Sequence, residues 1–132
     1  MIVLVQREEF QDEIERIRKK ETVSKTSKLR RLNPLIKNGL LRVGGRIRHA
    51  DLEHNKKCPI LLPGKHPFTD LLIRHTHEKQ LHAGINATLY ALRLNYWPVD
   101  GRSSVKKIVH NCVKCFRAKP RDVNYIMGNL PK

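Results

Sequence analysis

The sequence of 132 residues predicts an α+β fold, either one compact domain or a compact domain with an arm. Three observations predict this class. Residues 1–31 are highly charged and follow helical spacing, residues 32–65 combine turn signals with short apolar runs, and residues 66–120 carry helical patterns divided by helix breakers. Residues 121–132 show no period and are interpreted as a linker or tail. No internal repeat or low-complexity tract is present.

The first segment, residues 1–31, predicts a charged helical arm. Phe10, Ile14 and Ile17 recur at helical spacing. Acidic residues come early in this run and basic residues come late, which suits the dipole of a helix. Because so many of its side chains are charged, we expect a solvated arm that ends where Ser24 breaks the pattern.

Residues 32–65 predict two or three short strands that make a small β-hairpin or sheet. The Asn38-Gly39 pair is a strong turn signal, and an apolar run follows it from Leu40. A second apolar run, Cys58-Pro59-Ile60-Leu61-Leu62-Pro63, is bounded by prolines, so Pro59 is expected at the edge or start of a strand. Cys58 is interpreted as a small buried apolar side chain.

Residues 66–120 predict three helices. The first has Pro67 at its first helical position. The second starts near Gly84 and carries one apolar stripe that runs to Tyr96, where Pro98 stops it. The third begins at Ser103 or Ser104, which are good N-cap residues.

Paired histidines and paired cysteines flank the second and third of these helices. The pattern is His77-x4-His82, then 29 residues, then Cys112-x2-Cys115. Zinc in structural sites takes four nitrogen and sulfur ligands in a tetrahedron, and two helices folded back would bring both pairs together. The sequence therefore predicts one structural Zn²⁺. The chain has few aromatic residues, so its core is small and a bound metal would stabilise it. A redox C-x-x-C and two unligated thiols are the alternatives, although the strand-then-helix setting of a redox motif is missing.

The remaining histidines compete poorly for the metal. His75 lies two positions before His77, so on a helix it points about 200° away. His110 is expected to be exposed or bonded to backbone. His49, His54 and His66 fall in loops and are interpreted as ordinary surface residues.

The two ligand pairs are embedded in further short motifs. These are His77-Glu78, Leu81-His82-Ala83-Gly84, Thr88-Leu89, Leu92-Arg93, Tyr96-Trp97, Val105-Lys106-Lys107 and Cys112-Val113-Lys114-Cys115. Together they resemble the HHCC zinc-binding domain of retroviral and LTR-retrotransposon integrases. Upstream, Leu41 to Ile47 and Pro59 to Pro63 look like the Pol polyprotein of Bel/Pao-type retrotransposons, and Met127-Gly128 with Leu130-Pro131 resembles the link into that family's catalytic core.

This resemblance implies a three-helix zinc bundle, similar to a helix-turn-helix, that helps to assemble integrase on the DNA ends of the element. It also implies the ligands His77, His82, Cys112 and Cys115. The family's integration chemistry needs a separate downstream core with three carboxylates, and no acid lies between Gly101 and Arg121. We therefore expect no enzymatic activity from this chain, which the resemblance identifies as a fragment or a truncated genomic copy.

The charge predicts a polyanionic partner. Lys and Arg total 27 against 12 acids, a formal net charge of +15, and nucleic acid, most simply DNA, is the commonest partner for such an excess. A merely soluble or ribosome-like basic surface is the alternative.

The expected phosphate contacts are Arg102, Lys106, Lys107, Lys114, Arg117 and Lys119, with Arg42 and Arg46 on the hairpin. A further basic group, Lys28, Arg30 and Arg31, precedes the hairpin. Asn86, Tyr90 and Arg93 are weaker candidates. Trp97 is interpreted as core more readily than as a base-stacking platform.

The predicted function is that of a zinc-binding, nucleic-acid-binding accessory domain in DNA integration. The alternative is a zinc-stapled module for protein interaction, including self-association into a homo-oligomer. No membrane association is expected, because the apolar start of the chain is too short for a signal peptide or a membrane span. No small-molecule substrate is expected either. We expect an intracellular protein, nuclear or in cytoplasmic retroelement particles.

Overall fold

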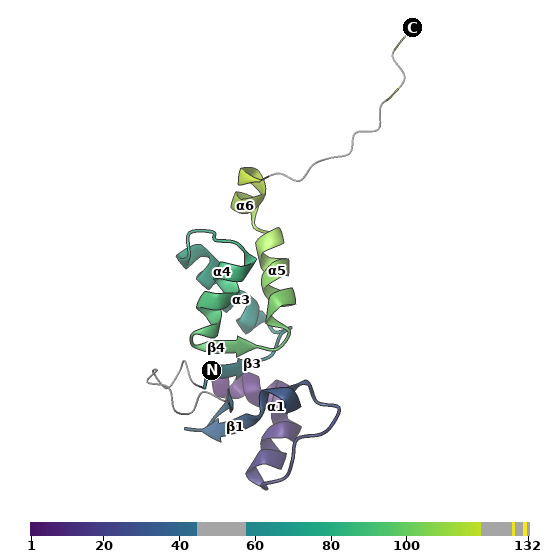
Figure 1. Ribbon diagram of the computed structural model, residues 1–132, viewed down its shortest axis with the longest axis vertical. Coiled ribbons are helices and arrows are strands. Elements are labelled where there is room, and N and C mark those ends of the chain that lie inside the picture. Colours follow the sequence, from purple (N-terminus) through teal and green to yellow (C-terminus); the bar gives the residue numbers. More distant parts are fainter. Residues whose placement is uncertain (45–57, 120–127, 129–130, 132) are drawn as a thin grey trace.

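The computed structural model describes residues 1–44 and 58–119, together with Gly128 and Pro131. This part of the chain has a mixed α+β fold, as predicted, with five α-helices, one 3-10 helix and a four-stranded sheet (Figure 1). The elements in chain order are α1 (Ile2–Arg18), η1 (Lys28–Leu32), β1 (Pro34–Lys37), β2 (Leu40–Val43), β3 (Ile60–Leu62), α3 (Pro67–Lys79), α4 (Ile85–Arg93), β4 (Tyr96–Pro98), α5 (Gly101–His110) and α6 (Val113–Ala118).

The sheet has the strand order β1-β2-β3-β4. β1 and β2 form an antiparallel hairpin, and Asn38 and Gly39 at its turn have φ values of 55° and 75°. Two positive φ values in succession are the mark of a type I′ turn, so the predicted hairpin is confirmed. β3 continues the sheet antiparallel to β2, and β4 lies parallel to β3.

β4 corrects the predicted extent of the second helix of the 66–120 segment. α4 ends at Arg93, and Tyr96 lies opposite Ile60 in the sheet instead of continuing the helical stripe. The parallel pairing supplies backbone hydrogen bonds that a longer helix would lose: the amide of Ile60 donates to Asn95 at 3.0 Å and the amide of Val99 donates to Leu62 at 2.9 Å. β4 is an edge strand, where Pro98 removes no ladder bond.

α1 is not the solvated arm that the sequence predicted. Its apolar face is buried through Val5, Phe10 and Ile14. The Gln6 side chain, 1% exposed, donates to the carbonyls of Leu41 and Leu61 at 2.8 and 2.7 Å and accepts from the Leu41 amide at 2.9 Å. These three bonds tie α1 to β2 and β3, so the charged residues of α1 cover only its outer side.

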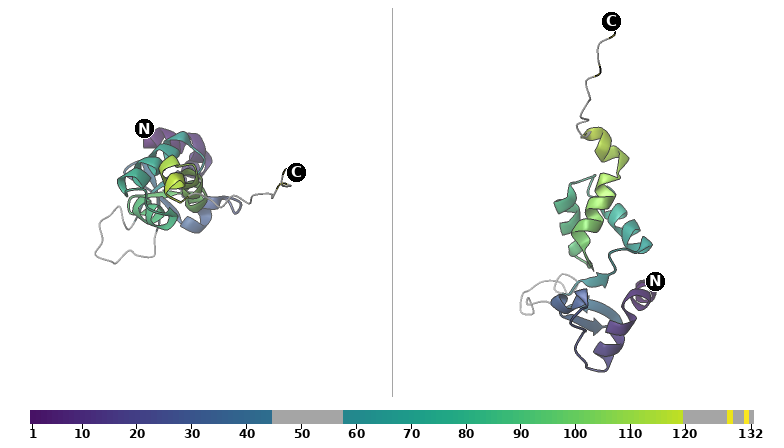
Figure 2. Two further views of the ribbon diagram at one scale, coloured as in Figure 1. Left: turned by 90° about the horizontal axis from the view of Figure 1, so that it is seen from above. Right: turned by 90° about the vertical axis from the view of Figure 1, so that its right-hand side faces the viewer.

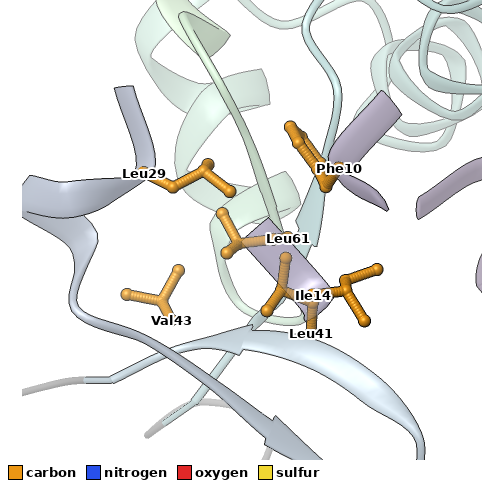
Figure 3. Packing of buried hydrophobic residues seen from close by; sticks show 6 residues of the cluster. All are labelled: Phe10, Ile14, Leu29, Leu41, Val43 and Leu61. Carbon is orange, nitrogen blue, oxygen red and sulfur yellow. The ribbon is translucent and has the colours of Figure 1, made fainter. Parts of the chain in front are cut away.

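The apolar core has two parts, one on each side of the β3–β4 pair. The first lies between α1, η1 and the sheet, and Figure 3 shows its buried members converging: Phe10, Ile14, Leu29, Leu41, Val43 and Leu61. The second lies within the helices that follow and consists of Ile73, Leu89, Leu92, Val105 and Ile108. The molecule is therefore built of two tiers stacked along its long axis (Figure 2). We call them the N-terminal tier, residues 1–44, and the helical tier, residues 63–119.

The helical tier differs from the prediction in two details. α5 begins at Gly101 and not at Ser103 or Ser104, and a fourth helix, α6, follows it. A Cβ atom at position 101 would lie 2.9 Å from Pro98 Cγ. Because Gly101 has no side chain, α5 can begin this close to the end of β4. Among the helices in the described ranges, none combines the length and the apolar character needed to cross a membrane.

Candidate metal centre

The four predicted ligands meet at the end of the helical tier farthest from α1. His77 lies in the last turn of α3 and His82 in the loop after it, while Cys112 immediately precedes α6 and Cys115 lies within α6. Their ligand atoms all lie within 4.8 Å of one another. Two stretches of chain, residues 77–82 and 112–115, thus bring two nitrogen atoms and two sulfur atoms to a common point.

The spacing of these atoms fits a tetrahedral zinc ion. Zinc bond lengths place two nitrogens about 3.3 Å apart, a nitrogen and a sulfur about 3.6 Å apart, and two sulfurs about 3.8 Å apart. His77 Nε2 and His82 Nδ1 are separated by 3.3 Å. Cys115 Sγ lies 3.2 Å from His77 Nε2, and His82 Nδ1 lies 3.3 Å from Cys112 Sγ and 3.9 Å from Cys115 Sγ. Two nitrogens and two sulfurs at these separations suit one structural zinc ion.

The loop after α3 is folded to bring His82 back onto His77. Leu81 and His82 both adopt left-handed backbone conformations, with φ values of 55° and 57°, and the His82 amide donates to the His77 carbonyl at 2.9 Å. Such conformations are unfavourable for residues other than glycine. Two in succession are retained where the surroundings fix them, and a metal bound by His82 would do so.

His77 has a buried partner on the side away from the metal. Its ring is 1% exposed, and its Nδ1 atom lies 3.4 Å from the hydroxyl of Thr88, which itself donates to the Ala83 carbonyl at 3.2 Å. With Nε2 directed to the metal, the ring proton is on Nδ1 and is donated to Thr88. Bonds of this kind fix the tautomer and orientation of a ligating imidazole. Sequence reasoning missed Thr88; its one signal is a polar residue beside the apolar stripe of α4.

The protonation of the ligands also favours a metal. Burial, and secondly the nearby His82, lower the pKa of His77, so that the imidazole is neutral and able to ligate. The backbone amide of Cys115 lowers the pKa of the Cys112 thiol, whereas burial raises the pKa of the Cys115 thiol. Cys112 therefore ionises more readily, and a bound dication supplies the charge that stabilises both thiolates.

The competing histidines and the third cysteine lie elsewhere. His75 is outside the metal group and exposed, and His110 is exposed, as predicted. His66 is not an ordinary surface residue: its Nδ1 accepts the Phe68 amide at 3.1 Å and caps α3. Cys58 is half-buried, which is less than predicted. His49 and His54 are outside the described residues.

The predicted phosphate contacts are mostly at the surface. Those of the helical tier are all exposed: Arg102, Lys106, Lys107, Lys114, Arg117 and Lys119. Arg42 corrects the prediction, because it is 6% exposed and its Nη1 donates to the Cys58 carbonyl at 3.1 Å, so it ties β2 to the residues before β3 instead of facing a ligand. Arg46 lies outside the described residues.

The weaker candidates divide in the same way. Asn86 and Tyr90 are exposed, and Asn86 accepts from Arg102 Nη1 at 3.3 Å. Trp97 packs against the first core cluster, and the guanidinium of Arg93 lies 4.2 Å from the centre of its ring. Trp97 is therefore half-buried at the margin of the core.

Comparison with known proteins identifies the segment that carries the ligands. Residues 65–121 match the family model of the integrase zinc binding domain. A search of curated proteins and a search of solved structures gave no match. The matched segment contains both histidines and both cysteines in one tetrahedral group. Residues 65–121 thus match the integrase zinc binding domain, and the HHCC ligand set within them suits one structural zinc ion.

Proposed function

We propose that this protein is a nucleic-acid-binding accessory part of a retrotransposon integrase, of the Bel/Pao type, and that its zinc ion shapes the binding surface. The family match supports the integrase assignment, and the motifs upstream of it support the type of element. The matched module is an accessory domain, distinct from a catalytic core, so we propose no reaction for it. We place the protein in the nucleus or in cytoplasmic retroelement particles.

The observation that carries this proposal is the basic face of α5 and α6. Residues 101–119 hold six lysines and arginines and no acid, and all six are exposed. Arg102 and Lys106 are separated by one helical turn, so they lie on one face of α5. A row of cations without intervening carboxylates suits phosphate groups, and its affinity for them falls steeply with salt.

Zinc is coupled to this surface through α6. This helix has six residues, and none of them is buried. A helix so short is unstable alone, and apolar packing does not hold this one. Its attachment depends on Cys112 and Cys115, whose sulfurs face the histidines of α3 and the loop after it. Zinc thus fixes the position of Lys114 and Arg117.

The test is binding of the zinc-loaded chain to duplex DNA, followed by fluorescence anisotropy over a series of salt concentrations. We expect tight binding at low salt, and a weaker affinity with a shallower salt dependence for Lys106→Gln/Lys107→Gln. A matched control, Lys19→Gln/Lys37→Gln, removes two exposed lysines from the N-terminal tier and should bind as the wild type does. Absence of wild-type binding, or equal effects of both pairs, would refute the proposal. Single-stranded RNA measured in parallel decides between the two nucleic acids.

A second candidate function is self-association through the zinc loop. Leu81, at 89% exposed, and Phe116, at 52% exposed, line one groove beside His82 and Cys115. Apolar side chains so exposed around a metal site favour a protein interface, here with a second copy of the chain. Sedimentation of the wild type against Leu81→Ser/Phe116→Ser tests this: a dimer lost in the variant supports it, and a wild-type monomer at all concentrations contradicts it.

A further inference from the structure

A cleft of about 660 Å³ lies where the N-terminal tier meets the helical tier. One wall is the segment around η1, which contributes Lys25, Lys28, Arg30 and Arg31. The other wall is the stretch after β4, which contributes Asp100, the only acid among the lining residues described. All four basic residues lie outside the segment that the integrase family model matches.

We infer that this cleft is a second nucleic-acid site, which binds the phosphodiester backbone. The inference rests on the proposed function. All four basic side chains are exposed, and within the described ranges no carboxylate pairs with Arg30 or Arg31. Guanidinium groups present their donors in a planar fork that matches two phosphate oxygens, so an adjacent pair of arginines is suited to a phosphate ligand.

The cleft adjoins the start of α5, the helix that carries further cations, and this favours a polymer over a small anion. Asp100 is the N-cap residue of α5, and Arg102 follows it by two positions. The exposed cations of α5, Arg102 and Lys106, therefore follow the cleft residue Asp100 by two and six positions. An extended chain of regularly spaced negative charges is the ligand that engages such a row along its length.

Asp100 opposes this ligand. Its backbone is left-handed, with φ 54°, and its side chain makes no capping bond to α5. The carboxylate instead pairs with Lys28 Nζ at 2.5 Å, where both side chains are more than half exposed. Asp100 thus neutralises one of the four cations, Lys28, and adds a negative charge to the cleft. A phosphate that enters must compete with it for Lys28.

The site is predicted to be indifferent to base sequence. Trp97 also lines the cleft, but its ring carries the Arg93 guanidinium and packs against the first core cluster, so a base does not stack on it. The groups that remain to bind are charged side chains that meet phosphates, and these position a nucleic acid without reading it.

Two variants with opposite expected signs test the inference in the zinc-loaded full chain. Arg30→Gln/Arg31→Gln should weaken binding to a labelled DNA duplex and make the slope of log affinity against log salt shallower by about 0.9 for each phosphate group that is no longer neutralised. Asp100→Asn should tighten binding several-fold. Lys19→Gln/Lys37→Gln is the matched control for loss of two positive charges, and zinc content with circular dichroism checks that each variant is folded.

The outcomes separate this inference from the proposed function. If the wild type binds DNA and Lys106→Gln/Lys107→Gln weakens it, but Arg30→Gln/Arg31→Gln matches the control pair, the cleft is not a site and the proposed function stands. If the wild type does not bind, both fail. Poly-glutamate serves as a protein-like polyanion: loss of its binding in the arginine variant, with DNA binding unchanged, would assign the cleft to an acidic protein and overturn the inference.

Discussion

The Sγ atom of Cys115 lies 3.2 Å from the Nε2 atom of His77, although 38 positions separate the two residues in the sequence. This proximity joins α6 to α3, two helices from opposite ends of the zinc-binding segment. His82 and Cys112 complete the group, so a single ion at this point links two distant stretches of backbone, residues 77–82 and 112–115. The stability of the helical tier should depend on it.

Replacing Cys115 by serine should abolish stoichiometric zinc binding. The hydroxyl is a far poorer zinc ligand than a thiolate, and structural zinc contributes on the order of 10 kcal/mol to folding in small metal-stapled domains. We expect one zinc per wild-type chain by mass spectrometry, and a large fall in zinc content and in Tm for Cys115→Ser. Cys58→Ser is the matched control and should keep its zinc, because Cys58 is outside the metal group. Full zinc content in Cys115→Ser would contradict the assigned ligands.

Removal of the metal by a chelator should weaken DNA binding by the helical tier. Without zinc, α6 has no buried side chain to hold it, so Lys114 and Arg117 lose their fixed position. Anisotropy before and after chelation, then after zinc is restored, measures the effect. Recovery on adding zinc separates loss of the metal from irreversible unfolding, and unchanged affinity of the metal-free protein would refute the coupling.

Thr88→Val should lower zinc affinity about 10- to 100-fold, which is the usual effect of removing a buried partner of a metal-bound histidine. The substitution keeps the shape of the side chain but removes the hydroxyl that accepts the His77 Nδ1 proton. Thr88→Ser keeps the hydroxyl and should bind zinc nearly as the wild type does. Competition with a coloured chelator gives both affinities, and equal values for the valine variant and the wild type would show that the bond is dispensable.

Gln6→Ala should destabilise the protein by about 2–4 kcal/mol, because it leaves the buried backbone groups of Leu41 and Leu61 without their partner. Zinc content should not change, since Gln6 belongs to the other tier. Gln11→Ala, on the exposed side of α1, is the control and should have little effect. Urea unfolding measures the difference, and a value as small as that of the control would mean that the three bonds do not hold α1 to the sheet.

Acidification should release zinc and destabilise the fold. Burial lowers the pKa of His77 in the folded protein, so below the unfolded value of about 6.5 the unfolded chain binds more protons than the native one. The contribution of this group to stability is complete above that pH and is lost as the pH falls from there through the lower pKa of the folded protein. Metal ligation needs deprotonated ligands, so acidification also weakens zinc binding. Zinc retention and Tm measured from pH 8 to pH 5 should fall together, and a Tm that rises on acidification would be inconsistent with this site.

The parts of the fold that were predictable are those set by local sequence. The Asn38-Gly39 turn and the start of α3 at Pro67 follow from residues close together in the chain. The ligand pairs belong here too, because each occupies a short stretch whose spacing restricts how it can meet a metal.

The errors arise from interactions between distant residues. The charged sequence of α1 predicted a solvated helix, but one face of α1 is buried. Gln6 on that face bonds to backbone groups 35 and 55 positions away, which the local pattern does not reveal. Tyr96 belongs to a strand and not to the preceding helix because β3 pairs with it. Arg42 is buried because its guanidinium donates a hydrogen bond to the Cys58 carbonyl. Thr88 was missed because its role depends on the orientation of the His77 ring, which spacing does not specify.

The parallel pairing of β3 with β4 affects how the protein can be divided. β3 ends at Leu62, so a fragment cut at residue 65, the start of the matched segment, would keep β4 and lose the strand beside it. Tyr96, Trp97 and Pro98 would then form an open edge, and the ring of Trp97 would lose the apolar surface that covers it. Such edges pair readily with other chains. Poor solubility of the excised domain would therefore result from the loss of β3 and not from a defect in the zinc-binding helices.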